Sequence, residues 1–243
     1  MIILDKKGKV PLYYQLIDGI LKEIENGKLP EHTKLFTERE LCELYNISRA
    51  TVRQAVSILE KDGHIYRVQG RGTFIAPKKI EQTLENFYSF GDEVKKIGMK
   101  PSSKIVSLEI IALPGHISKK IGYMEAEKFY KLIRVRLADN EPMVYEETYI
   151  PYGRFPNLKS NEIEEQGLYP LFKEVYDAKL DYATESFFVC SVGENVAKYI
   201  REVADTPAMR LERITYEKDK VVEYTESVIK GSKFKFTATL KNI

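Results

Sequence analysis

The feature that most constrains the fold is the stretch 48–59, S-R-A-T-V-R-Q-A-V-S-I-L. Its apolar residues recur at the i, i+3, i+4 and i+7 spacing of one helix face, namely Val52, Ala55, Val56 and Leu59. The opposite face carries Ala50, Arg53, Gln54 and Ser57, with Arg49 at its edge. Arginine can bond guanine and glutamine can bond adenine in a major groove. Taken alone, the helix fits DNA recognition and an ordinary solvated surface helix equally well.

The residues before this stretch predict a second helix, joined to it by a short turn. Thr37 and Glu40 have the spacing of a capping box. This helix begins after Thr37, and its inner face should carry Leu41, Leu44 and Tyr45. Asn46 and Ile47 form the turn, and Ser48 caps the next helix. Two helices joined in this way form a helix-turn-helix unit.

Two further elements complete a winged helix. Pro11 suits the first turn of a helix, and Gly27 suits the position just after its C-terminal end. The apolar residues of this helix recur at a spacing of four: Leu12, Leu16, Ile20 and Ile24. After Gly63, residues 65–68 and 73–76 are predicted strands of a hairpin. The tip of this hairpin is formed by Gln69, Gly70 and Arg71. It has no large side chains except those of Gln69 and Arg71, so its backbone can lie against DNA. This order of elements favours DNA binding over a plain surface helix.

Four segments resemble the winged-helix domain of GntR-type bacterial transcription regulators: residues 11–15, 38–41, 48–55 and 70–74. The usual Pro-Gly before the second helix is replaced by Glu31 and His32, which predicts a shifted loop. The resemblance implies that Arg39, Arg49, Arg53 and the wing tip contact DNA. The candidate DNA-binding residues are therefore Arg39, Ser48, Arg49, Ala50, Thr51, Arg53, Gln54, Gln69, Gly70 and Arg71.

Composition limits the function classes. The chain has 243 residues, enough for two domains, and a net charge of +2, which is too small for a generic polyanion binder. Cys42 and Cys190 fall in different predicted domains, so we expect buried thiols rather than a disulfide. The three histidines are scattered, so we expect neither a metal site nor a cofactor. With no secretory segment and no run of 18 apolar residues, we expect a cytoplasmic protein without a membrane contact.

The remaining sequence predicts a second domain of different texture. We expect a winged helix-turn-helix domain over 1–76, a linker over 77–83, and a domain for effector binding and dimerisation over 84–243. Hairpins 129–150 and 209–229 mixed with isolated helices indicate an α+β fold with an antiparallel sheet. The predicted helices are 89–97, 168–176 and 194–203, and the other predicted strands are 105–112, 182–192 and 235–240. The weak likeness of the two hairpins suggests two pseudo-equivalent halves beside a pocket.

This second region resembles the UTRA effector domain of the HutC branch of GntR regulators, which is similar to the chorismate-lyase fold. The likeness rests on 87–90, 131–143, Glu146, 149–151 and Glu223, and it is strongest with sensors of phosphorylated amino sugars. Two positions that carry hydroxyl side chains in such sensors are Gly91 and Gly167 here. The resemblance implies an effector site that contains Ser89, Phe90, Arg134, Arg136, Glu146, Tyr169 and Glu223.

The arginine pair is the chemical centre of this expected site. Arg134 and Arg136 lie two apart on a strand, so they point to one face, where they can clamp an anion or pair with neighbouring carboxylates. Ser89 would add donors at a helix start, while Glu146 and Glu223 would bind hydroxyls or an amine. Each of these side chains also has an ordinary structural role: cap, ion pair or, for Tyr169, core.

The sequence thus predicts a homodimeric transcriptional regulator, a repressor, that binds a pseudopalindromic DNA operator. A small anionic metabolite, a sugar phosphate or amino-sugar phosphate, would control its operator affinity. Two alternatives stay open at this point. One is an enzyme with a lyase-like C-terminal domain, although no acid–base or nucleophile constellation is recognisable. The other is a GntR relative that senses a non-phosphorylated carboxylate.

Overall fold

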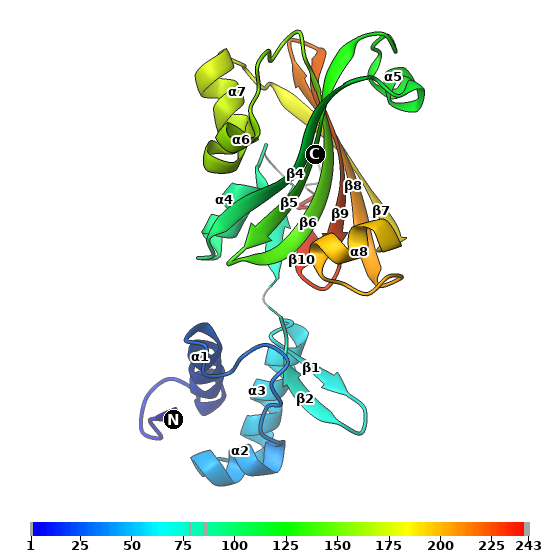
Figure 1. Cartoon of the computed structure of the whole chain (residues 1–243). Coiled ribbons are helices and arrows are strands. Elements are labelled where there is room, and N and C mark those ends of the chain that lie inside the picture. Colours follow the sequence, from blue (N-terminus) through cyan, green and yellow to red (C-terminus); the bar gives the residue numbers. More distant parts are fainter. Residues whose placement is uncertain (1, 78, 85–86, 241–243) are drawn as a thin grey trace. The chain divides into compact units, whose positions relative to one another are not determined.

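The structure is a computed structural model that describes residues 2–77, 79–84 and 87–240. The chain divides into two compact units, Met1–Lys78 and Lys79–Ile243. Figure 1 shows the helical first unit and the second unit, which is built around a large sheet. Each unit has its own hydrophobic core, so each is described by itself.

The first unit is a three-helix core with a β-hairpin. Its elements are α1 (Leu12–Glu25), α2 (Glu38–Tyr45), α3 (Arg49–Lys61), β1 (Ile65–Val68) and β2 (Gly72–Ile75). The predicted apolar face of α3 is confirmed, because Val52, Ala55, Val56 and Leu59 are all buried. These residues pack against Leu16 and Ile20 of α1 and Leu41 of α2. Leu44 was expected to face inward with Leu41, but it is exposed near the end of the short α2.

The predicted helix starts are confirmed in detail. The Glu40 backbone N–H donates to Thr37 Oγ1 at 3.2 Å, and the Thr37 N–H donates to Glu40 Oε2 at 2.7 Å. Ser48 Oγ accepts from the Thr51 N–H at 3.1 Å, which fixes the start of α3. Between the two helices, Asn46 takes a left-handed conformation and makes the turn tight. The helix-turn-helix geometry is therefore set by short-range bonds.

The loop before α2 departs from the usual Pro-Gly in an informative way. His32 has φ 62°, a left-handed conformation that normally favours glycine. Its ring Nδ1 lies 3.0 Å from the Tyr66 hydroxyl, and the two rings meet edge to face. Side-chain contacts thus hold a conformation that the family's glycine would adopt freely.

The second unit contains a six-stranded antiparallel sheet in the order β4-β5-β6-β9-β8-β7. The strands are β4 (Pro101–Ala112), β5 (Lys128–Ala138), β6 (Glu141–Pro151), β7 (Tyr182–Ser191), β8 (Pro207–Glu217) and β9 (Lys220–Lys230). The antiparallel α+β prediction is confirmed. A separate two-stranded sheet pairs β3 (Ile80–Thr83) with β10 (Phe234–Thr237), and this pair is parallel.

The sheet consists of two similar halves, as the paired hairpins suggested. Residue n of β4-α5-β5-β6 corresponds to residue n + 79 of β7-α8-β8-β9, so Arg134 corresponds to Arg213. Both hairpins have two left-handed turn residues, and both have a register shift at the same place, after Arg136 and after Thr215. The Tyr145–Glu147 bond of one half recurs as Tyr224–Glu226 in the other.

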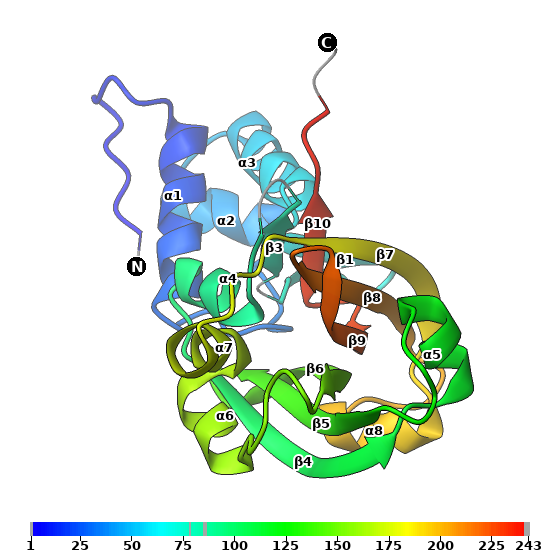
Figure 2. The same cartoon turned by 90° about the horizontal axis from the view of Figure 1, so that it is seen from above.

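Helices cover both faces of this sheet (Figure 2). The face that carries Arg134 packs against α4 (Phe90–Lys96), α6 (Ser160–Gln166) and α7 (Leu168–Tyr176). The other face packs against α5 (Gly115–Ile121) and α8 (Glu194–Ile200). These two helices are related by the same spacing of 79 positions.

Several elements differ from the sequence prediction. The short elements α5, α6 and β3 were not expected, since each has seven residues or fewer. Residues 80–83 were placed in the linker, but they form β3, because Ile80 and Gln82 turn into the unit's interior. The helix expected over 194–203 ends at Ile200, where Arg201 takes a left-handed conformation, and the last strand ends at Thr237 rather than residue 240. Cys42 and Cys190 are free thiols, each half-buried rather than buried.

Candidate DNA-binding surface and ligand cavity

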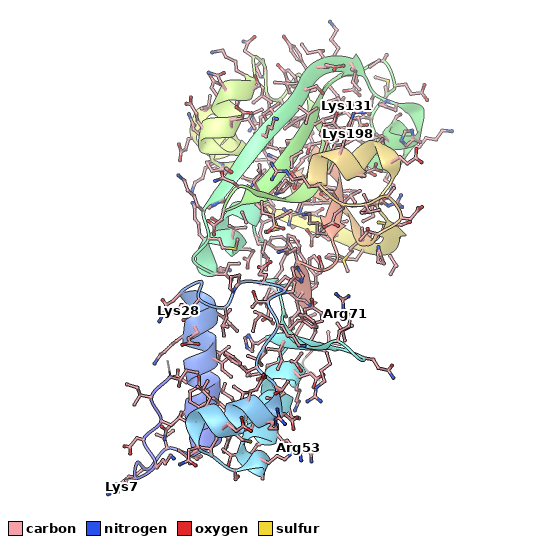
Figure 3. The ribbon with its side chains drawn as sticks, turned by 60° about the horizontal axis from the view of Figure 1, so that its bottom comes forward. Lys7, Lys28, Arg53, Arg71, Lys131 and Lys198 are labelled. Atoms are coloured by element: carbon pink, nitrogen blue, oxygen red, sulfur yellow. The ribbon has the colours of Figure 1, made fainter. Side chains whose placement is uncertain are left out.

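The polar face of α3 is open to solvent. Arg49, Ala50, Arg53 and Gln54 are exposed, because the apolar residues between them face the core. Among the residues that the structure describes, no carboxylate lies within salt-bridge distance of Arg49 or Arg53. Figure 3 shows Arg53 projecting outward from its helix. These two guanidinium groups are free to meet phosphate or base edges.

The other residues predicted on this surface have mixed surroundings. Arg39 is exposed beside Glu43, with 3.7 Å between Nε and Oε1. The hydroxyls of Ser48 and Thr51 bond each other at 2.8 Å, so both take part in the helix cap. The exposed Arg39–Glu43 ion pair is weak and costs little to break, so Arg39 can still turn toward a phosphate.

The wing presents a narrow tip. Gln69, Gly70 and Arg71 are exposed, and the Arg71 N–H donates to the Val68 carbonyl at 3.0 Å to close the turn. Gly70 has φ 74°, which this turn position requires and which favours glycine. Figure 3 shows Arg71 at the hairpin of the first unit. The wing therefore offers one exposed cation, Arg71, on a tight backbone turn.

An N-terminal arm adds charge that the sequence reasoning missed. Lys6 Nζ donates to the carbonyl of Asn46, in the turn before α3, at 2.8 Å. Gln15 of α1 holds the arm by bonds to both the N–H and the carbonyl of Asp5. The charge of Lys6 therefore lies beside the turn before α3.

A cavity of about 410 Å³ lies in the second unit, on the sheet face that carries Arg134. Both halves of the sheet contribute to its floor, and α4, the start of α7 and the β3–β10 pair contribute to its walls. It brings together all seven residues of the expected effector site: Ser89, Phe90, Arg134, Arg136, Glu146, Tyr169 and Glu223. The predicted pocket between two pseudo-equivalent halves thus exists.

The two arginines of this cavity have unequal partners. Arg134 Nε donates to Glu146 Oε2 at 2.5 Å, whereas Arg136 Nη1 lies 3.6 Å from the same oxygen. Arg136 Nε is buried and has no hydrogen-bond partner in the described part of the chain. Burial lowers the pKa of Arg136 to about 10, and the neighbouring charge of Arg134 acts in the same direction. Burial alone would raise the Glu146 pKa, but Arg134 and Arg136 bring it below its ordinary value. One carboxylate therefore serves two guanidinium groups.

A third arginine, which the sequence analysis did not place in the site, is held on the opposite half. Arg213 Nε donates to Glu185 Oε1 at 2.7 Å, and its Nη1 donates to the Tyr169 hydroxyl at 2.9 Å. Tyr169 in turn donates to Glu223 Oε2, which also accepts from Thr215. Burial raises the pKa of the Tyr169 hydroxyl, so it stays protonated. The spacing of 79 from Arg134 was the sequence signal that could have found Arg213.

Two expected ligand contacts are already engaged with the protein. The Ser89 hydroxyl donates to Asp92 Oδ2 at 2.6 Å and accepts from the Asp92 N–H, so it acts as the cap of α4. Glu223 accepts from three hydroxyls, the third being Thr225 at 2.8 Å to Oε1. Gly91 and Gly167, the two positions that lack the hydroxyl side chains of related sensors, also line the cavity. Hydroxyl groups reach the lining from other positions instead, namely Ser102, Ser103, Thr225 and Ser227.

Two further features are absent from the described residues. Across 2–77, 79–84 and 87–240, no group of three or more His, Cys, Asp or Glu side chains could hold a metal ion. Within the same ranges, no helix has both the length and the apolar character to cross a membrane.

A winged helix-turn-helix unit followed by a second unit with a cavity of metabolite size is the architecture of a two-domain transcription regulator. Comparison with known proteins assigns the family. Residues 12–75 match the gntR family of bacterial regulatory proteins, and residues 96–235 match the UTRA domain. The chain therefore belongs to the GntR family, in its UTRA-containing HutC branch, and it is a sequence-specific DNA-binding transcriptional regulator.

Individual relatives are similar to this protein over nearly the whole chain. The HTH-type transcriptional repressor NagR of Bacillus subtilis is 30% identical over 234 residues, 96% of each chain. The mannosyl-D-glycerate transport/metabolism system repressor MngR of Escherichia coli is 25% identical and covers 95% of this chain and 96% of its own length. The crystal structure of PhnF from Mycobacterium smegmatis matches with a TM-score of 0.79 at 25% identity, over 93% of this chain and 99% of that one.

Proposed function

We propose that this regulator is a repressor whose operator affinity is controlled by a small anion, a sugar phosphate or amino-sugar phosphate, bound in the cavity on Arg134 and Arg136. The observation that carries the proposal is the under-paired Arg136. Its Nε has no partner in the described chain, and its neighbour Glu146 is already bonded to Arg134. A buried cation of this kind is stabilised by a bidentate anion such as phosphate.

The lining supports a ligand with hydroxyl groups as well as charge. Thr225, Ser227 and Ser103 add hydroxyl groups to the cavity lining, and the Phe90 ring centroid lies 4.8 Å from the Arg136 guanidinium. A cavity of about 410 Å³ falls in the usual size range for small metabolites. The relative MngR is named for a mannosyl-D-glycerate system, a sugar-bearing carboxylate, which fits a polar anionic ligand.

A lyase-like enzyme remains the second candidate class, and the cavity disfavours it. A general acid or base needs a free group with a pKa near the operating pH. Glu223 is bonded by three hydroxyls, and Glu146 is bonded by Arg134 with its pKa below the ordinary value. Burial raises the pKa of Tyr169. We therefore propose that the cavity binds its ligand without transforming it.

We propose further that the protein acts as a homodimer on a pseudopalindromic operator in the cytoplasm. A single winged helix presents few base contacts, and two half-sites increase specificity. Light scattering on the full chain at micromolar concentration should give twice the monomer mass. A monomer mass, with or without operator-length DNA, would overturn this part of the proposal.

The effector proposal is tested by thermal shift against glucosamine 6-phosphate, fructose 6-phosphate, inorganic phosphate and glycerate. At a hundredfold excess over Kd, a ligand should stabilise the protein by about 2.7 kcal/mol. Arg136→Met should lose this shift, whereas Arg210→Met, which changes an arginine of the same sheet outside the cavity lining, should keep it. A shift with glycerate alone would support the carboxylate-sensing alternative. Stabilisation by none of the anions would overturn the proposal.

A further inference from the structure

One polar group of the cavity is left unexplained by the arginine site. Gln82, in β3, is 4% exposed, and its Nε2 has no hydrogen-bond partner among the described residues. Buried side-chain donors almost always have a partner, so an unpaired one calls for an explanation.

The surroundings of Gln82 make this amide conspicuous. In the parallel β3–β10 pair, Gln82 lies opposite Phe236, and Ile80 lies opposite Phe234. Ile80, Phe234 and Phe236 pack in one hydrophobic cluster with Phe90 of α4. A desolvated, unpaired amide opposes folding, and an apolar side chain of the same size would avoid that cost. Stability alone therefore does not account for glutamine at this place.

The cavity offers the missing partner. Gln82 lines the same cavity as Arg134 and Arg136, together with Phe234 from the neighbouring strand. A side-chain amide nitrogen donates to hydroxyl, carbonyl or phosphate oxygens. The guanidinium groups are also donors only, so none of them can accept from Nε2.

We propose that Gln82 Nε2 donates a hydrogen bond to an oxygen of the bound effector, and that this bond connects the ligand to β3. The inference rests on the proposed function and extends it. The first unit's last strand, β2, ends at Ile75, and β3 begins at Ile80, so β3 is the first element after the join. A ligand bonded to Gln82 thus acts on the strand that continues from the DNA-binding unit, whereas Arg134 and Arg136 lie on β5.

The test compares the wild-type chain, Gln82→Met and the control Glu81→Gln by titration calorimetry with glucosamine 6-phosphate and fructose 6-phosphate. Methionine keeps the volume and removes the donor. Glu81 lies on the same strand but is exposed, and it pairs with Lys235 of β10 at 2.8 Å, so its variant reports a loosened strand pair. We expect Kd to rise at least tenfold in Gln82→Met and to change less than twofold in Glu81→Gln. The ligand-free melting temperature of Gln82→Met should equal or exceed that of wild type.

The outcomes separate the two ideas. If wild type binds a probe and Gln82→Met binds it equally well, the Gln82 inference is wrong while the proposed function stands. If wild type binds neither probe, the sugar-phosphate proposal falls, and the inference falls with it. If Gln82→Met does not fold, a crystal structure of the wild-type complex decides. A distance of about 3.2 Å or less from Nε2 to a ligand oxygen supports the inference, and a bond to water alone overturns it.

Discussion

The two units present arginine in opposite ways. In the first unit, Arg49 and Arg53 are exposed, with no ion pair to the described residues. In the second, Arg134 and Arg213 are buried, and each donates to a carboxylate at fixed geometry. Exposed cations suit a long polyanion, because they adapt to phosphates along a groove. Buried and oriented cations suit a single small anion of defined shape. We therefore propose that the same residue type serves two different kinds of recognition in the two units.

The largest expected difference concerns folding stability. Glu146→Gln leaves two buried guanidinium groups without their shared carboxylate, and breaking a buried pair in this way costs about 3–5 kcal/mol. Arg53→Ala removes an exposed side chain and should leave the unfolding free energy within about 0.5 kcal/mol of wild type. Urea denaturation of both variants measures the contrast. Equal stability of the two would show that the cavity carboxylate is not a structural counter-ion.

For operator binding we expect the opposite, namely that changes in the first unit have a larger effect than changes in the second. Arg49→Ala and Arg53→Ala should each weaken binding to a specific operator by about 1–3 kcal/mol and reduce its salt dependence. Arg210→Met, in the second unit, should change binding little. Fluorescence anisotropy at equal salt gives the comparison. Wild-type affinity in both α3 variants would mean that another surface reads the DNA.

The two units also differ in how much of their secondary structure could be predicted from the sequence. Local signals carry the first unit: a capping box, a helix stripe and a glycine turn each act within a few residues, and the structure shows all three. The second unit depends on pairings between distant segments. Strand β3 was missed because its partner β10 lies some 150 residues away along the chain, and four-residue strands carry little local pattern.

The candidate site shows the same limit. The alternation along β5 predicted that Arg134 and Arg136 share a face, and both line the cavity. The sequence could not show that Glu146 would already be bonded to Arg134, because the register between β5 and β6 decides that contact. Nor could it show Gln82 in the wall, since Gln82 reaches the cavity through the β3–β10 pair.

A smaller effect should appear on acidification. The folded-state pKa of Glu146 lies below its ordinary value of 4.5, because Arg134 and Arg136 outweigh the effect of burial. The stabilisation from this carboxylate is therefore complete above about pH 4.5 and is lost as pH falls through the folded-state pKa. The unfolding free energy of wild type should fall more steeply below pH 4.5 than that of Glu146→Gln. Parallel slopes would contradict the assignment.

The smallest effect tests the local rule in the first unit. His32→Gly relieves a left-handed conformation that costs a side chain about 1–2 kcal/mol. It also removes the contact with Tyr66, a bond of about 0.5–1.5 kcal/mol. The net change should stay within about 1 kcal/mol, whereas His32→Ala loses the bond and keeps the strain, so it should be the less stable of the two. Thermal unfolding that ranks alanine above glycine would contradict this account.

If a small anion in the cavity controls DNA binding, operator affinity should change when glucosamine 6-phosphate is added. Arg136→Met is the variant of choice, because Glu146 keeps its bond to Arg134 when Arg136 is removed. We expect a ligand-induced change of about 1–3 kcal/mol in the operator affinity of wild type and none in that of the variant, with equal ligand-free affinities. A variant that responds to the ligand like wild type would show that the effector does not bind at Arg136.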